Sequence, residues 1–344
     1  MTHGKINKAH SQPLGNIVTI LNLLSRLLLA VGLLYGLLAS SAWADSCTFT
    51  PAAVTLPPSS SVATNTTTVN AQGNTPMACS GLGVSLLSTY SLSAKISSTT
   101  NNLNLKNAAG DLIPYSIYRN GTFSPALGIN GILDYSSANL LVIGLTGITA
   151  NLPIYIRTGT NGAINVNISA GTYTDVINLA WTYNICKVAA LGACVGGYWT
   201  GTGTGTDIST VTVTLVVSKD CAINSAQDVN FGSFALVGQF NAISQNITLT
   251  CTKGSTFNTY VTTGNNPVTN WQQMKLTSST ATDYLQYQLY QGASGSTLWN
   301  STSMQPGTGT GAQQQVPFHA VINPNQNQRT PGDYKDDVSL VLVY

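Results

Sequence analysis

Glutamate is absent from this chain of 344 residues, and charge of either sign is scarce. All 11 acidic residues are aspartates, and charged residues make up only 7% of the sequence. A surface with so few cations cannot neutralise a phosphate backbone, which argues against nucleic-acid binding. A glycosidase-type carboxylate pair would have to come from scattered aspartates, which argues against that class of enzyme.

Histidine is just as scarce beyond the first residues. His319 is the only one after residue 10, and it lies inside an expected strand beside Phe318. A Ser–His–Asp arrangement would therefore depend on a histidine whose expected role is structural. No pair of cysteines has the spacing of a zinc finger. We expect no enzyme, no metal site and no cofactor.

Long apolar runs are confined to the start of the chain. Three cations accompany the run Leu27–Leu38, and Ala42-Trp43-Ala44 follows as a small-x-small cleavage site. This pattern predicts a signal peptide over residues 1–44 and an exported chain of 344 − 44 = 300 residues. Two alternatives stay open, a start downstream of Met1 and an uncleaved membrane anchor.

All six cysteines lie beyond residue 44, where an exported protein forms disulfides. Two of the possible pairs close loops of similar length, 79 − 47 = 32 and 251 − 221 = 30 residues. These two pairs occupy corresponding positions in an internal repeat, which selects them and leaves the remaining two cysteines as a third pair. The expected disulfides are Cys47–Cys79, Cys221–Cys251 and Cys186–Cys194.

The similar loops belong to a longer internal repeat. Gly171-x-Tyr173-x-Asp175 matches Gly332-x-Tyr334-x-Asp336, and from there Tyr183 and Tyr344 align without a gap. A period of about 170 residues is typical of two whole domains rather than a solenoid. We expect a signal peptide over 1–44, an N-terminal domain over 45–219 and a C-terminal domain over 220–344.

Short β-branched and aromatic runs, bounded by Gly, Asn, Pro and Ser, dominate both copies. No apolar period of 3.6 residues persists in the mature chain, so the sequence predicts two all-β sandwiches. The expected strands are Ser85–Ile96, Asp111–Tyr118, Leu140–Leu145, Leu152–Arg157, Ile164–Ile168, Val176–Tyr183, Val211–Ser218, Asn246–Cys251, Thr259–Thr263, Tyr284–Tyr290, Val316–Ile322 and Val338–Tyr344.

The two copies differ after the matching tyrosines. Tyr183 is followed by 36 residues (184–219), in which Val211–Ser218 alternates with period two and would close the first sandwich. No residue follows Tyr344, so we expect a second sandwich that lacks its last strand and exposes an apolar edge. The edge residues are Val338, Leu340, Leu342 and Tyr344. A missing strand that is not needed, or that the linker supplies, remains the alternative.

The second copy resembles a known family. The residues that carry the resemblance are Cys221-x-Ile223, Val229-Asn-Phe231-Gly232, Leu249-Thr-Cys251, Tyr284–Tyr290, Trp299 and the terminal Gly332-x-Tyr334-x-Asp336. In this order they resemble the spore coat protein U domain family, which includes the subunits of archaic (Csu-type) chaperone–usher pili. The first copy matches more loosely.

The resemblance implies an incomplete immunoglobulin-like pilin fold that is completed by donor-strand complementation, a form of β-strand addition. The implied partners are a periplasmic pilus chaperone, an outer-membrane usher and an adjacent pilin subunit that supplies the strand. Asp45-Ser46 leaves no room for a donor strand before Cys47. We therefore expect a two-domain tip adhesin, exported through the periplasm to the cell surface at the pilus tip.

An adhesin of this kind would attach through loops of its first domain. Three stretches are unusually apolar for loops, and in related Csu-type adhesins such loops bind abiotic surfaces, so we expect attachment to abiotic or host surfaces and biofilm formation. The candidate residues are Leu82, Val84, Leu86, Leu87, Leu127, Ile129, Ile132, Leu191, Val195, Tyr198 and Trp199. The alternatives are a glycan-binding adhesin, with Trp181, Trp199 and Tyr198 at its site, and a secreted spore-coat or matrix protein.

Overall fold

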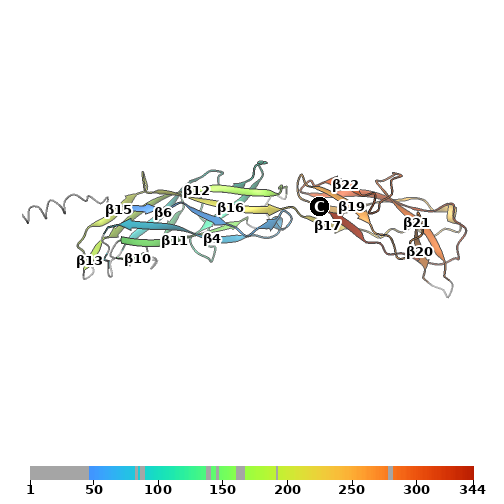
Figure 1. Ribbon diagram of the computed structural model, residues 1–344, viewed down its shortest axis with the longest axis horizontal. Coiled ribbons are helices and arrows are strands. Elements are labelled where there is room, and N and C mark those ends of the chain that lie inside the picture. The colour runs from blue at the N-terminus through green and yellow to red at the C-terminus, as the bar shows by residue number, and fades with distance from the viewer. Residues whose placement is uncertain are drawn as a thin grey trace, which may run out of the picture. The chain divides into compact units, whose positions relative to one another are not determined.

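The computed structural model describes residues 46–81, 84–85, 90–136, 141–144, 147–159, 167–190, 193–277 and 282–344. Residues Cys47–Tyr344 form one compact unit, and strand pairing divides it into two sets, β1–β16 and β17–β25, both visible in Figure 1. We call these sets the first and the second sandwich. Across the described ranges, no helix has the length and apolar character needed to span a membrane.

Thirteen strands of the first sandwich form a single curled sheet whose main path runs β1-β4-β11-β8-β7-β12-β16-β2. Its strands are β1 (Cys47–Phe49), β2 (Ala52–Thr55), β3 (Ser59–Ser60), β4 (Asn70–Ser80), β6 (Ser91–Thr99), β7 (Asn104–Lys106), β8 (Leu112–Tyr118), β9 (Ile132–Asp134), β10 (Leu141–Gly144), β11 (Gly147–Thr158), β12 (Gly171–Cys186), β15 (Tyr198–Thr202) and β16 (Ile208–Ser218). A 3-10 turn, η1 (Ala63–Asn65), follows β3.

Strand β16 closes the first sandwich. Its alternation turns Val211, Val213, Leu215 and Val217 into the core, where all four are buried, while the threonines between them face outward. It pairs antiparallel with β12 and parallel with β2. The last strand of this sandwich therefore comes from the chain itself, as the sequence predicted.

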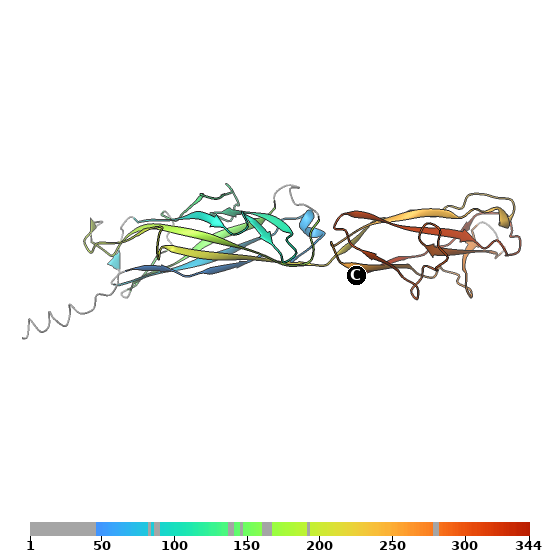
Figure 2. The same ribbon diagram turned by 90° about the horizontal axis from the view of Figure 1, so that it is seen from above.

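The second sandwich has two sheets, ordered β17-β18-β23-β21-β20-β24 and β22-β19-β25, whose strands Figure 2 shows from above. The strands are β17 (Cys221–Ser225), β18 (Ile243–Cys251), β19 (Thr256–Val261), β20 (Gln272–Leu276), β21 (Tyr284–Gln291), β22 (Gln305–Thr308), β23 (Gln313–Ile322), β24 (Tyr334–Lys335) and β25 (Leu340–Val343). A second 3-10 turn, η2 (Val237–Gln239), follows β17.

The internal repeat is visible in the packing of both sandwiches. Cys47–Cys79 joins directly opposed residues of β1 and β4, and Cys221–Cys251 does the same for β17 and β18. Cys186–Cys194 forms the third disulfide. All three disulfides agree with the sequence prediction, in which the repeat pairs the first two and leaves the third.

Most of the expected strands agree with the observed ones within a few residues. The expected strand Ser85–Ile96 does not, because Val84–Ser85 and Ser91–Thr99 are separate strands, Tyr90 is in neither, and residues 86–89 lie outside the described residues. Val338 and Ser339, the start of the expected strand Val338–Tyr344, are not in a strand either. Ile168, the end of the expected strand Ile164–Ile168, is not in a strand, and residues 164–166 lie outside the described residues. The expected signal peptide over 1–44 lies outside them as well. Several polar strands, β4 among them, were not predicted.

Candidate functional site

Two aspartates, the buried Asp175 and the half-buried Asp336, occupy equivalent places in the sandwiches. Asp175 accepts hydrogen bonds from the Tyr115 hydroxyl at 2.9 Å and from the Asn101 backbone amide at 2.9 Å. Asp336 accepts them from the Tyr287 hydroxyl at 2.7 Å and from a backbone amide of the neighbouring loop, that of residue 265, at 2.8 Å. Both carboxylates therefore anchor loops to strands, the role the sequence predicted in place of acid–base chemistry.

A second equivalent pair lies two residues earlier in each copy. The Tyr173 hydroxyl donates to the Ser169 carbonyl at 2.6 Å, and the Tyr334 hydroxyl donates to the Thr330 carbonyl at 2.8 Å. A tyrosine that bonds back to the backbone a few residues upstream is the tyrosine corner of immunoglobulin-like sandwiches. The Gly-x-Tyr-x-Asp motif is thus structural, and no cluster of metal-ligating side chains occurs among the described residues.

Two of the three apolar stretches come together at one end of the first sandwich. Strand β5 (Val84–Ser85) pairs with β13 (Val188–Ala190), and β13 pairs with β14 (Ala193–Cys194). Figure 1 shows β13 near β10 at this end. Segments about 100 residues apart in the sequence therefore form one small sheet, which the sequence alone did not indicate.

Exposed apolar side chains follow this small sheet. Val195 is 66% exposed and Tyr198 is 49% exposed, and the Cys186–Cys194 disulfide holds the base of their turn. The Lys187 amide donates to the Gly197 carbonyl at 2.9 Å. The turn therefore presents two large apolar groups from a fixed backbone.

Trp199 is a correction to the expected contact surface. It pairs with Ile185 of β12, and alternation along β15 turns it inward while Tyr198 faces out. Its indole is buried, and its Nε1 donates to the Ser80 carbonyl at 3.0 Å. Trp181 is buried too, with Nε1 bonded to the Ser209 hydroxyl. Neither tryptophan can stack on a sugar at the surface.

The middle apolar stretch does not join the other two. Leu127 bridges Ile117 partway along β8, and Leu127 and Ile129 pack half-buried against the core. Ile132 is exposed, but it lies on the edge strand β9, which pairs only with β6 and places Ile132 opposite Lys95. The remaining candidates, the side chains of Leu82, Val84, Leu86, Leu87 and Leu191, lie outside the described residues.

Among the described residues, each sheet of the second sandwich has two edge strands, β17 and β24 in one sheet and β22 and β25 in the other. The edges of β25 and β17 are the ones whose equivalents in the first sandwich are joined by a further strand. Strand β25 pairs only with β19, and β17 pairs only with β18. Strand β12 is the equivalent of β25, and the segment that continues β1 into β2 is the equivalent of β17. In the first sandwich, β16 joins the two by pairing with both β12 and β2. No described strand of the second sandwich occupies the place of β16.

Side chains at equivalent positions are more exposed in the second sandwich than in the first. Ile177 is 0% exposed and its equivalent Val338 (338 − 177 = 161) is 37% exposed. Tyr183 is 4% exposed, whereas Tyr344 at the same offset is 56% exposed. On the opposite edge, Phe49 is 6% exposed and Ile223 is 43% exposed. Sequence reasoning named Val338 and Tyr344 but missed Ile223, whose own strand, β17, it did not predict.

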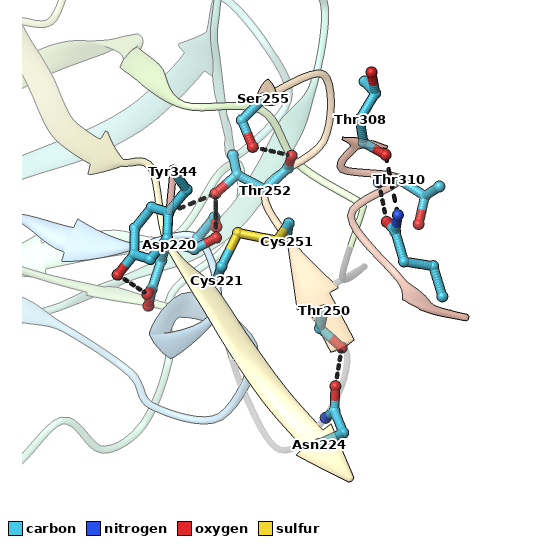
Figure 3. The surroundings of a disulfide bond; sticks show 12 residues. Asp220, Cys221, Asn224, Thr250, Cys251, Thr252, Ser255, Thr308, Thr310 and Tyr344 are labelled. Carbon is cyan, nitrogen blue, oxygen red and sulfur yellow. Dashed lines mark hydrogen bonds between the residues drawn. A yellow bond between two sulfur atoms is a disulfide. The ribbon is translucent and has the colours of Figure 1, made fainter. Parts of the chain in front are cut away.

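The two edges meet at one point, drawn in Figure 3. The Tyr344 hydroxyl donates to Asp220 Oδ1 at 3.3 Å, beside the Cys221–Cys251 disulfide. The other oxygen of Asp220 accepts from the Ser60 hydroxyl at 2.5 Å. Asp220 also donates its backbone amide to the Thr252 hydroxyl at 2.7 Å. The end of β25 is therefore bonded to the residue that precedes β17.

Comparison with solved structures gives the fold. A chain of the CsuC–CsuE chaperone–tip adhesion subunit pre-assembly complex, from archaic chaperone–usher Csu pili of Acinetobacter baumannii, is 20% identical with a TM-score of 0.51. The similarity covers 87% of this chain and 100% of that one. The CupB6 tip adhesin from Pseudomonas aeruginosa is 11% identical with a TM-score of 0.33, over 86% of this chain and 94% of that chain.

Among curated protein sequences, none matches the chain significantly. The family model for the Spore Coat Protein U domain matches twice, over residues 34–180 and 207–340. These two matches cover most of the sequence and fall on the two sandwiches, and the chain belongs to the Spore Coat Protein U domain family.

Proposed function

We propose that this chain is the tip adhesin subunit of an archaic chaperone–usher pilus, with an adhesin domain over 45–219 and a pilin domain over 220–344. The observation that carries the proposal is the contrast between the sandwiches: Ile177, which pairs with β16 in the first, is 0% exposed, whereas its equivalent Val338 is 37% exposed. A strand added from another polypeptide would cover Val338. The fold similarity to the chain from the chaperone–tip adhesion subunit complex supports the same assignment.

The proposed partners follow from this role. A signal peptide directs the chain to the periplasm, where a chaperone covers the edge residues Val338, Leu340, Leu342 and Tyr344. The usher and the adjacent pilin subunit then bring the chain to the cell surface. There the apolar turn around Val195 and Tyr198 contacts abiotic or host surfaces and supports biofilm formation.

The test of strand acceptance uses a peptide that copies residues 207–218, which include β16 of the same chain. We expect it to bind the mature protein, because β16 fills the equivalent place in the first sandwich. Isothermal titration calorimetry measures the affinity. A peptide with Asn at the four inward positions is the control, and equal binding of the two peptides would refute an apolar acceptor edge.

The test of attachment uses Val195→Asn together with Tyr198→Asn. We expect retention of cells on polystyrene to fall severalfold, because two exposed apolar contacts are lost. Val216→Asn is the matched control: Val216 is an exposed valine that pairs with Thr172, toward the other end of β12. Unchanged attachment of the double variant, with pili still made, would remove this turn from the contact surface.

A further inference from the structure

Tyr183 and Tyr344 end the two aligned repeats, and in the first sandwich Tyr183 has a carboxylate as its hydrogen-bond partner. The Tyr183 hydroxyl donates to Asp207 Oδ1 at 3.0 Å. Asp207 directly precedes β16, and its backbone carbonyl accepts from the Trp181 amide at 2.8 Å. The carboxylate at the start of the closing strand is therefore recognised by Tyr183.

This recognition takes place in a confined site. Gly201 lies opposite Tyr183 on β15, where a Cβ would collide with the tyrosine ring. Burial, followed by the hydrogen bond to Asp207, raises the pKa of Tyr183 to about 12. The hydroxyl therefore stays protonated and acts as a donor to the carboxylate.

Tyr344 stands at the same place in the second sandwich, without a closing strand beside it. Its hydroxyl donates to Asp220, a carboxylate of the segment between the sandwiches, and its side chain is largely exposed. The bond is longer than that of Tyr183, 3.3 Å against 3.0 Å. Asp220 thus accepts the hydrogen bond of Tyr344, whereas the equivalent hydroxyl of Tyr183 donates to the residue that precedes the closing strand.

We propose that the strand accepted by the second sandwich carries an aspartate directly before its alternating segment, and that Tyr344 selects it by donating a hydrogen bond to that carboxylate. This inference rests on the proposed function. The incoming carboxylate replaces Asp220 as the acceptor of the hydrogen bond from the Tyr344 hydroxyl. The backbone carbonyl of the incoming aspartate accepts from the Leu342 amide, which is equivalent to the Trp181 amide of the first sandwich. Tyr344 is then a specificity-determining residue.

The contact would also fix the register of the added strand. In β16 the apolar residues stand four, six, eight and ten positions after Asp207. A slip of one residue turns them outward and is excluded by burial. A slip of two keeps them inward, so apolar packing discriminates against it only weakly. The pairing of the carboxylate with Tyr344 occurs in one register alone.

The experiment compares two peptides on two proteins. The peptides are the copy of residues 207–218 and the same peptide with Ala in place of its first Asp, and the proteins are the full mature chain and its Tyr344→Phe variant. We expect the Ala peptide to bind the unaltered chain about fivefold more weakly, because Tyr344 then keeps its bond to Asp220 and only the difference between the two hydrogen bonds is lost. In Tyr344→Phe the two peptides should bind equally.

Tyr284→Phe, on β21, is the matched control and should preserve the fivefold difference. Equal binding of both peptides to the unaltered chain would overturn the inference and leave the open edge standing. A difference that persists in Tyr344→Phe would also overturn it, because the carboxylate would then be recognised elsewhere. Failure of both peptides to bind would refute the proposed strand acceptance itself, and this inference with it.

Discussion

Asp175 connects a loop to the core of the first sandwich through a buried carboxylate. It is 2% exposed and accepts bonds from Tyr115 and from the amides of Asn101 and Val176. Asp175→Ala leaves these donors without an acceptor, so we expect a loss of about 3 kcal/mol in the free energy of unfolding. Urea unfolding measures it. Asp228→Ala, at an exposed aspartate, should change stability by less than about 0.5 kcal/mol.

Asp283 gives the second sandwich a measurable acid response. The Thr330 amide is the main cause that lowers the pKa of Asp283 to about 2. In the unfolded chain the pKa is about 4, so the stabilisation is present above pH 4 and is lost as the pH falls toward 2. Between pH 4 and pH 2, thermal unfolding of Asp283→Asn should depend less on pH than that of the unaltered chain. Parallel curves would contradict this role.

Single residues also show where sequence reasoning stops. The Gly-x-Tyr-x-Asp motif predicted structural aspartates because backbone anchoring needs only local chemistry. Trp199 was expected at the surface because its neighbours are apolar and rich in glycine, and only its pairing with β12 reveals the inward direction. The partnership of Tyr183 with Asp207 depends on contacts across strands, which no spacing in the sequence encodes.

At the scale of elements, strands with alternating apolar residues were predictable and polar strands were not. β12 and β16 carry a clear period of two. β4 contains Gly73 and Pro76 and buries only every second residue of a polar run. Gly73 is required because a Cβ there would collide with Val54 of β2. The requirement arises from a different segment of the chain, so a local pattern cannot reveal it.

The disulfide of the β13–β14 turn is expected to serve attachment more than folding. The double variant Cys186→Ser and Cys194→Ser opens a loop with a sequence separation of only 8. Both cysteines lie beyond the part of β12 that pairs with β16, Gly171–Ala180. We expect two-thirds or more of the attachment to polystyrene to be lost, because Val195 and Tyr198 lose a fixed backbone. The fold of the first sandwich should survive, as measured by circular dichroism. Full attachment of the double variant would contradict this role.

At the scale of the whole molecule, two copies of one repeat differ in how far the described strands cover equivalent positions. The aligned repeat in the sequence is enough to pair Ile177 with Val338 and Tyr183 with Tyr344. It cannot show how far their exposures differ, because burial depends on the strand that lies beside them. The first sandwich thus serves as an internal reference for what the second lacks.

This difference predicts two unfolding transitions for the mature chain. Among the described residues, the first core has 32 fully buried apolar residues and 7 half-buried ones, whereas the second has 14 and 9. The second sandwich should therefore melt first. A copy of residues 207–218 at about 100 times its Kd adds roughly 2.7 kcal/mol to the free energy of unfolding of the second sandwich. This should raise only the lower transition, by about 10 °C. Differential scanning calorimetry resolves the two transitions, and the peptide with Asn at the inward positions is the control. A single transition, or an equal shift of both, would mean that the open edges do not limit the stability of the second sandwich.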